Sequence, residues 1–252
     1  MSIFEGILLF TASLIGSAMN AVAGGGSFFT FPALIFTGLP ILNANATSTV
    51  ALFPGTITSS YSYRANLDKD RGKLIALSSV SVVGSILGTA LLIYTPPTVL
   101  KSLLPWLLLI ATILLIFKKR IAASKLQGHI GGRPAFALAF QFVISIYGGY
   151  FGGGMGILML ASLNLMGYSD LVKMNALKTF LGAFINGIGV LLFTFGGLVF
   201  WGQALLMIVA SLIGGYMGAV FGTRVPGKIL HAFIVAVGLV LTTYFFVDSF
   251  RH

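Results

Sequence analysis

The sequence predicts an all-α integral membrane protein of about eight transmembrane helices, arranged as two homologous four-span halves. Three observations predict this fold: a mean hydropathy of +1.02, a series of apolar runs near the length of a bilayer span, and an internal repeat. Only 8% of the 252 residues are charged. A soluble domain typically has about 25% charged residues, so lipid is the expected solvent for most of the chain.

The charge balance indicates a membrane orientation signal rather than a nucleic acid partner. The chain has 15 basic and 5 acidic residues, and most of the basic ones fall in short segments between apolar runs, where they orient helices. No basic face with interleaved aromatic residues is present, so no nucleic acid is expected as a partner. The absence of cysteine excludes disulfides and thiolate metal sites, and we expect no metal site.

Eight apolar runs are the candidate spans, because each approaches the length of about 20 residues that a helix needs to cross a bilayer. The N-terminal run contains Glu5 and lacks a basic region, so we expect an uncleaved first span. The eight runs are 3–23, 46–64, 74–94, 102–117, 135–151, 175–195, 203–222 and 229–247. Two further apolar segments, 27–39 and 156–166, are about half as long, and each follows a full span and a glycine cluster.

The chain repeats itself at a constant offset. NATST (45–49) lies 130 positions before NALKT (175–179), and the same offset relates the glycine pair 84 and 88 to the pair 214 and 218. We therefore expect a first transmembrane repeat over 1–117, a basic cytoplasmic linker over 118–133 and a second repeat over 134–252. Internal repeats are common in secondary transporters, and they also occur in channels and scaffolds.

The topology depends on the two half-length segments. If they are re-entrant, each half has four spans and the halves are parallel. If they cross fully, the halves are inverted, and the distribution of basic residues favours that arrangement. A helix of about 13 residues covers only about 20 Å, so the prediction is eight spans with two glycine-broken re-entrant helices. Segments 64–73 and 118–133 are cytoplasmic in both arrangements.

The glycine clusters indicate an anion site. Each glycine costs a helix about 1 kcal/mol relative to alanine, and irregular backbone at membrane depth is tolerated only inside protein or beside a watery cavity. A helix that starts at Ser27 after such a break directs its free N–H groups and the positive end of its dipole toward the turn. The second half offers the same arrangement at Met155 and Gly156. Two such ends near the membrane midplane would hold a small oxyanion.

Polar residues around the breaks complete the candidate site, and Lys178 is its candidate cation because an ionisable residue inside a span is a functional hypothesis. Other interpretations stay open: glycines also allow close helix packing, asparagines also join helices, and lysines also extend to the interface. For the glycine pairs at 84 and 88 and at 214 and 218, close packing is the preferred interpretation. The candidate substrate-binding residues are Gly24, Gly25, Gly26, Ser27, Asn45, Thr49, Gly152, Gly153, Gly154, Asn175, Lys178 and Thr179.

The residues predict a secondary transporter for a small anion that works by alternating access. No paired carboxylates lie inside a span and no catalytic constellation is present, so we expect neither enzyme activity nor a cofactor. An anion channel of the same fold and a permease for another small anion are the alternatives. The coupling ion, H⁺ or Na⁺, and the oligomeric state stay open.

Two sequence blocks resemble a known family. AVAGGGSFFTFPALIFTGLP with NATST, and GGYFGGGMGILMLASLNLMGYSDLVKMNALKT, are similar to the two signature blocks of the TSUP family, the sulfite exporter TauE/SafE-type permeases. The resemblance covers nearly the whole chain. It implies a multi-pass protein of the cell (inner) membrane that moves small sulfur-containing anions such as sulfite, sulfonates (sulfoacetate, for example) or thiosulfate, without a prosthetic group. NATST and NALKT stand where the family has a small-Gly-Thr-Ser type pattern.

Overall fold

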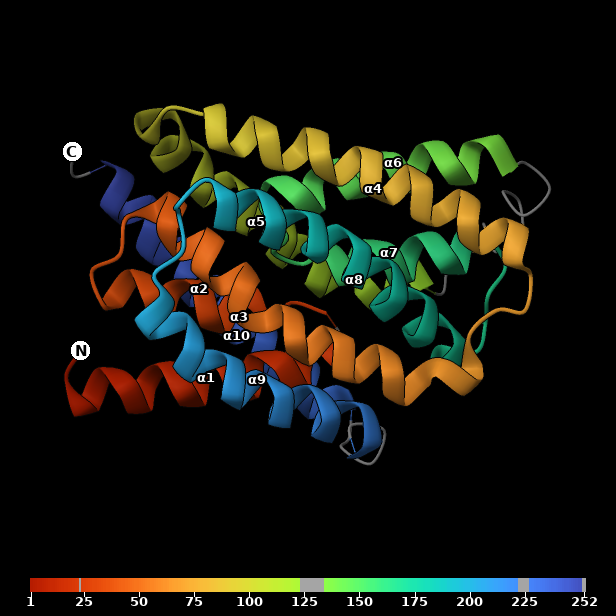
Figure 1. Ribbon diagram of the computed structural model, residues 1–252, viewed down its shortest axis with the longest axis horizontal. Helices are drawn as coiled ribbons and strands as arrows, with labels where there is room; N and C mark the ends of the chain where they lie inside the picture. Colours follow the sequence, from red (N-terminus) through yellow and green to blue (C-terminus); the bar gives the residue numbers. More distant parts are fainter. Residues whose placement is uncertain (23, 123–133, 222–226, 251–252) are drawn as a thin grey trace.

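The computed structural model describes residues 1–22, 24–122, 134–221 and 227–250. These residues form ten α-helices, mostly aligned with the long axis of the molecule (Figure 1), so the all-α prediction is confirmed for them. The helices are α1 (Ile3–Val22), α2 (Ser27–Phe36), α3 (Ile41–Tyr63), α4 (Arg71–Tyr94), α5 (Pro97–Ala122), α6 (Pro134–Tyr150), α7 (Met155–Leu165), α8 (Leu171–Phe195), α9 (Trp201–Phe221) and α10 (Gly227–Phe250), with a 3-10 turn, η1 (Arg64–Asn66), after α3.

The helix boundaries follow the apolar runs, with one shift that matters for the site. α3 and α8 begin at Ile41 and Leu171, about one turn before the predicted starts. α8 starts early because the Asp170 side chain accepts hydrogen bonds from backbone N–H groups of its first turn. The polar blocks 45–49 and 175–179 therefore lie inside helices. α5 extends into the predicted linker as far as residue 122, and the rest of the linker lies outside the described residues.

The order of long and short helices repeats along the chain. The 10-residue helix α2 follows α1, the 11-residue helix α7 follows α6, and three longer helices follow each short one. The packing partners repeat as well: α1 packs mainly on α9, α6 packs mainly on α4, and α5 packs on α10. We call α1–α5 the first series and α6–α10 the second series. Each series packs its first helix against the other series.

The directions of the helices follow from their contacts. The Ser13 and Ser17 hydroxyls of α1 donate to the Met207 and Ser211 carbonyls of α9, at 2.6 and 2.8 Å. A step of four residues along α1 matches a step of four along α9, so these helices run parallel.

α3 also runs parallel to α9. A side chain at Gly55 would meet the Ser211 carbonyl, and the Ser59 hydroxyl donates to the Gly215 carbonyl at 3.0 Å. α1 and α3 therefore point the same way, although only α2 separates them in the chain. It follows that α2 and its turns carry the chain back to the side where α1 began, as the ribbon shows (Figure 1).

The second series runs in the opposite direction. Thr49 lies beside Gly189, whereas Thr56 lies beside Gly182, so α3 and α8 are antiparallel. Because α3 and α8 hold the same place in the two series, the series are inverted. The prediction of parallel halves is wrong. It assumed that each half-length segment returns the chain to the side where the preceding long helix ended, whereas α2 returns the chain to the side where α1 began.

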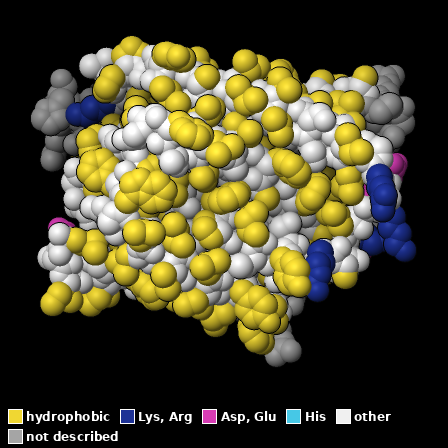
Figure 2. Space-filling view, viewed as in Figure 1, with side chains coloured by type: hydrophobic (Ala, Val, Ile, Leu, Met, Phe, Trp, Pro, Cys, Tyr) yellow, Lys and Arg dark blue, Asp and Glu magenta, His cyan; other side chains and the backbone are white. Residues whose placement is uncertain are grey.

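The basic residues agree with the inverted arrangement. The Lys73 ammonium donates to the Tyr168 hydroxyl at 2.6 Å, so the segments before α4 and before α8 lie at the same end of the molecule. A parallel arrangement would place Lys173 on the side opposite to 64–73. In the space-filling view most of the visible Lys and Arg side chains lie at this end, one group lies at the opposite end, and hydrophobic side chains cover the flank (Figure 2). By the positive-inside rule, this end is cytoplasmic.

Four helices are both long and apolar enough to cross a bilayer by length and composition alone: α1, α4, α8 and α9. The predicted count of eight spans is not established by that criterion, which was applied only to the described residues. α3 is also long, with 23 residues, but its first turns carry the polar block 45–49.

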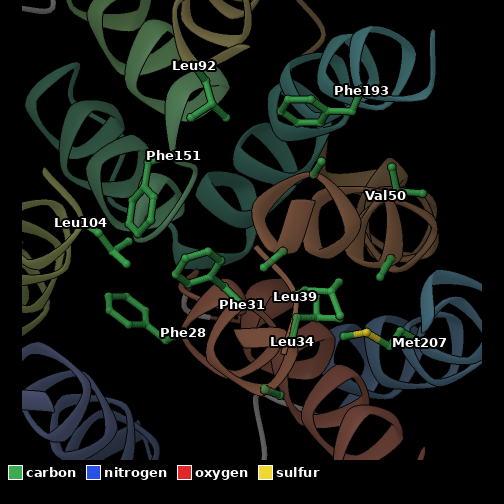
Figure 3. Close-up of a cluster of buried hydrophobic side chains, with 14 of the residues drawn as sticks. Phe28, Phe31, Leu34, Leu39, Val50, Leu92, Leu104, Phe151, Phe193 and Met207 are labelled. Carbon is green, nitrogen blue, oxygen red and sulfur yellow. The ribbon is translucent and has the colours of Figure 1, made fainter. Parts of the chain in front are cut away.

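Aromatic packing holds the half-length helix α2 in place. Phe28 and Phe31 are buried, and the Phe31 ring meets the Phe151 ring edge-on with 5.9 Å between the centroids. The close-up shows Leu104 of α5 and Leu34 of α2 in the same cluster (Figure 3). Burial of a phenylalanine contributes about 1.5–3 kcal/mol, which offsets the cost of the glycine break and fixes where α2 begins.

Candidate functional site

The two glycine breaks meet inside the protein. Gly24 has φ +79°, and a Cβ atom added there would lie 2.9 Å from the Gly156 Cα atom. A Cβ atom at Gly156 would likewise lie 2.9 Å from the Gly24 Cα atom. The turn after α1 and the first turn of α7 are therefore packed backbone against backbone, which only glycine permits at this separation.

The expected glycines and Ser27 occupy the turns before the short helices. Gly25, Gly26, Gly153 and Gly154 are buried, and Ser27 and Gly152 are half-buried. Gly26 and Gly154 precede the first residues of α2 and α7, and neither helix start has a side-chain cap. The first N–H groups of both helices therefore depend on other partners.

Lys178 binds the broken end of α1. Its Nζ atom lies 3.0 Å from the Asn20 carbonyl oxygen, 3.1 Å from the Ala21 carbonyl oxygen and 2.8 Å from Asn175 Oδ1. The residue is only 3% exposed, so the alternative that Lys178 extends to the membrane interface is wrong. Lys173, one and a half turns earlier in α8, is exposed.

The other series ends its first helix differently. The Asn45 amide donates to the carbonyl of Tyr150, the last residue of α6, at 3.2 Å. Thr49 and Thr179 occupy matching positions, and each hydroxyl donates to the carbonyl four residues earlier, at 2.9 and 2.8 Å. Each polar block thus contacts the end of the other series' first helix, through the neutral Asn45 amide in one case and through the Lys178 ammonium in the other.

A small polar cavity of about 20 Å³ lies beside the meeting point of the breaks. Its volume suits about one water molecule. Of the predicted site residues, only Lys178 and Thr179 line it, and the others lie at the turns or in helix-end contacts. The polar residues that line the cavity are Asn20, Thr56, Ser59, Lys178, Thr179 and Asn186.

Thr56 and Ser59 were missed by the sequence prediction. They stand three residues apart in α3, so they share one helix face, and their hydroxyls also bond to carbonyls four residues earlier, at 3.1 and 2.7 Å. The stretch 56–62 also holds Thr58, Ser60 and Ser62, so its hydroxyl content alone did not single out these two residues.

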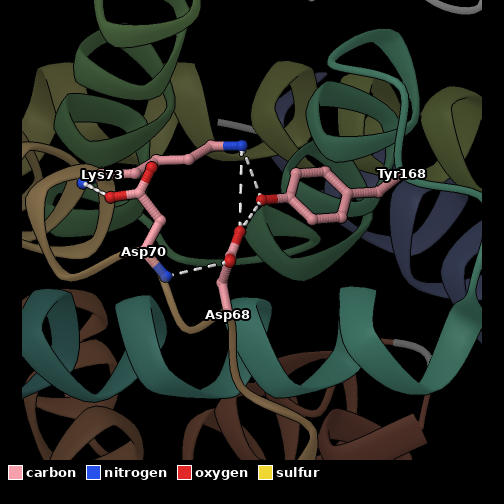
Figure 4. A network of polar contacts seen from close by, with 4 residues as sticks. All are labelled: Asp68, Asp70, Lys73 and Tyr168. Carbon is pink, nitrogen blue, oxygen red and sulfur yellow. Dashed lines mark hydrogen bonds and ion pairs between the residues drawn. The ribbon is translucent and has the colours of Figure 1, made fainter.

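A polar network joins the two series at the cytoplasmic end. The Tyr168 hydroxyl donates to an Asp68 carboxylate oxygen, the Asp70 backbone N–H donates to the other at 3.2 Å, and Lys73 lies 3.9 Å from the same carboxylate. Figure 4 shows these four residues joined across the two series. The hydrogen bond from Tyr168, chiefly, lowers the pKa of the Asp68 carboxyl, and burial raises the pKa of Tyr168.

A pocket of about 500 Å³ lies beside this network. Its lining includes Leu67 from the first series and Tyr168, Lys173 and Leu177 from the second. Leu177 in its lining directly precedes Lys178, which lines the small cavity.

Comparison with known protein families shows to which family the chain belongs. The family described as sulfite exporter TauE/SafE matches residues 8–245. The chain belongs to the sulfite exporter TauE/SafE family. The sequence resemblance is therefore confirmed, and the expectation of a membrane transport protein rather than an enzyme agrees with the family. With its apolar helices, the chain is a multi-pass protein of the inner membrane.

Three relatives in this family are similar over nearly their full length. The probable membrane transporter protein YfcA of Escherichia coli K12 is 31% identical over 251 residues, which cover 97% of this chain and 90% of that protein. The probable membrane transporter protein ORF9 of Sinorhizobium sp is 32% identical over 246 residues, which cover 95% and 92%. A probable membrane transporter protein of Haemophilus influenzae is 27% identical over 244 residues, which cover 96% and 94%. No solved structure matches the chain significantly.

Proposed function

We propose that this TauE/SafE family member is a secondary transporter that carries small sulfur-containing anions, such as sulfite, sulfonates or thiosulfate, by alternating access. The observation that carries the proposal is the buried Lys178 charge beside a polar cavity, at the point where the glycine breaks of two inverted series meet. Substrate sites of transporters built from inverted repeats lie at such a junction.

The cavity has to widen before substrate binds. A volume of about 20 Å³ holds about one water, whereas sulfite has four heavy atoms. We infer that the two series move apart on the cytoplasmic side, where the Asp68–Tyr168 contact joins them and the larger pocket leads toward Leu177. Lys178 and Thr179 then bind the anion together with Asn20 and Ser59.

The test is counterflow of radiolabelled sulfite in proteoliposomes, with sulfonates, thiosulfate, sulfate and chloride as competitors. A carrier gives saturable exchange and an order of competition. Ionic current without counterflow would show an anion channel, and no exchange of any of these anions by folded protein would refute the sulfur-anion assignment.

Thr179→Val tests the site itself. The variant removes the hydroxyl of a residue that lines the cavity, and we expect about tenfold weaker sulfite affinity, the loss typical of one hydrogen bond to a charged group. Thr49→Val is the matched control, because Thr49 makes the same bond to its own helix and does not line the cavity. Equal losses in both variants would place the anion elsewhere.

A further inference from the structure

The end of α1 presents oxygen atoms that suit a monovalent cation. The carbonyls of Asn20 and Ala21 belong to the last turn of α1, where no further turn of the helix donates to them. Both lie about 3 Å from the Lys178 ammonium, at 3.0 and 3.1 Å, and Asn175 Oδ1 lies at 2.8 Å. Three neutral oxygens therefore converge on one buried positive charge.

This set of atoms is typical of ion sites in broken helices. Main-chain carbonyls at a helix C-terminus coordinate Na⁺ in transporters with unwound helices, and hard cations take carbonyl and amide oxygens. The C-terminal end of the helix dipole adds a partial charge of about −0.5. None of these three oxygens belongs to a carboxylate, so the set suits a single positive charge.

The other series shows that a charge is not needed to end a helix here. At the end of α6, the Tyr150 carbonyl accepts from the neutral Asn45 amide. The residue that matches Lys178 is Ser48, whose hydroxyl instead bonds to Thr30 at 2.6 Å. The Lys178 ammonium therefore differs from the neutral Asn45 amide in bringing a positive charge to the helix end.

The lysine is held in this position by the neighbouring glycine break. A Cβ atom at Gly156 would lie 3.3 Å from the Lys178 Cδ atom, so the side chain passes over a residue that has none. Its hydrocarbon part is thereby packed against the start of α7, and the ammonium is delivered to the end of α1.

We propose that the Lys178 ammonium is a built-in replacement for a dissolved monovalent cation at the broken end of α1. The oxygens of Asn20, Ala21 and Asn175 form a Na⁺-type site, and the lysine occupies it permanently. The wild-type protein then needs no Na⁺ at this position, and Lys178→Ala opens the site to one. This inference goes beyond the proposed transport function, because it does not depend on which anion is carried.

The test is thermal unfolding of purified protein in chloride salts of Na⁺, Li⁺, K⁺ and N-methyl-D-glucamine at equal ionic strength. The wild type and the control Lys173→Ala, which removes an exposed lysine from the same helix, unfold at the same temperature in all four salts. Lys178→Ala unfolds earlier in N-methyl-D-glucamine, and saturating Na⁺ raises its midpoint by about 3 °C or more. Adding Asn175→Ala to that variant weakens the response to Na⁺.

One further variant and one further salt make every outcome decisive. Lys178→Met keeps the bulk of the side chain without its charge, and we expect it to stay less stable than the wild type in every salt. Wild-type stability of Lys178→Met, or an unfolding midpoint of Lys178→Ala that is equal in all four salts, would overturn the proposal. Recovery of folded Lys178→Ala in NaCl but not in N-methyl-D-glucamine chloride would support the proposal. Failure to recover this variant in any of these salts or in methylammonium chloride would overturn the proposal. Since no sulfur anion is present, the result is independent of the counterflow experiment.

Discussion

At the scale of single residues, Gly24 has two separate reasons to be glycine. Its φ of +79° is unfavourable for a side chain, and a Cβ atom there would lie 2.9 Å from the backbone of Gly156. Gly38 shares only the first reason, because it has φ +86° with nothing within 4 Å of the added atom. The pair therefore allows backbone strain to be separated from the contact between the two breaks.

We expect Gly24→Ala to destabilise the protein by about 1–3 kcal/mol more than Gly38→Ala, the usual cost of overpacking. Both variants carry a similar penalty of about 1 kcal/mol for the left-handed backbone. Chemical unfolding of the purified variants measures the difference, and equal stabilities would show that the two breaks separate readily.

A second prediction at this scale concerns the contact of Asp68 with Tyr168. Tyr168→Phe removes the main cause of the lowered pKa of Asp68 and is expected to cost about 1 kcal/mol at neutral pH. A lowered carboxyl pKa stabilises the fold above the unpaired value of about 3.9, and that contribution is lost as the pH falls through the lowered pKa. The stability difference from the wild type should therefore hold above about pH 4 and shrink below it. Unfolding curves between about pH 3 and 8 check this, with Tyr94→Phe, an exposed tyrosine, as the control.

At the scale of helices, glycine rows bring the two series into contact. A Cβ atom at Gly88 would lie 2.0 Å from the Ile146 carbonyl oxygen, and one at Gly218 would lie 2.4 Å from the Ala18 carbonyl oxygen. The predicted packing role of these glycines is confirmed. In both pairs, α4–α6 and α9–α1, glycine lets the two helix backbones approach so closely that a side chain would not fit between them.

Gly88→Ala and Gly218→Ala should therefore each lower stability by about 1–3 kcal/mol, because the helices must separate to admit a methyl group. Gly202→Ala is the control, since its position in the first turn of α9 has open space around it and alanine favours the helix. Thermal unfolding in detergent compares the three variants. A large loss in Gly202→Ala, or none in the other two, would contradict the packing argument.

At the scale of the whole molecule, the inverted series place the segment before α4 and the segment before α8 at the same end, which is the cytoplasmic one. The contact of Lys73 with Tyr168 joins the segment before α4 to the segment before α8. The opposite end holds the loops before α3 and after α8, where the Asn43 amide donates to the Leu198 carbonyl at 2.9 Å. The basic residues then fall mainly on one side, as orientation in a membrane requires.

Cysteine labelling tests this topology, because the chain has no cysteine of its own. An impermeant maleimide applied to intact cells should label Pro40→Cys and Phe195→Cys. It should label Lys69→Cys and Ser169→Cys only after the membrane is made permeable. Labelling of positions 69 and 169 from opposite sides would restore the parallel arrangement.

The sequence alone determined that the chain is a helical membrane protein, where its helices lie, where they break and which family it resembles. Hydropathy, glycine clusters and helix caps are local properties, so they can be read from short stretches of sequence. The same information misplaced the starts of α3 and α8 by about a turn. In α8, Asp170 caps the helix at Leu171, four residues before the start that the apolar run indicated, because Lys173 interrupts the apolar pattern there.

Only the tertiary structure decided the direction of the second series, the partners of Lys178 and the residues of the small cavity. Each depends on contacts between distant positions: Lys178 binds a carbonyl 158 residues away, and Ser13 binds one 194 residues away. Such contacts are selected by the packing of whole helices, and the choice between inverted and parallel halves depended on the path of a 10-residue helix. Hydropathy reports the depth of that helix in the membrane and contains no information on the side to which it returns the chain.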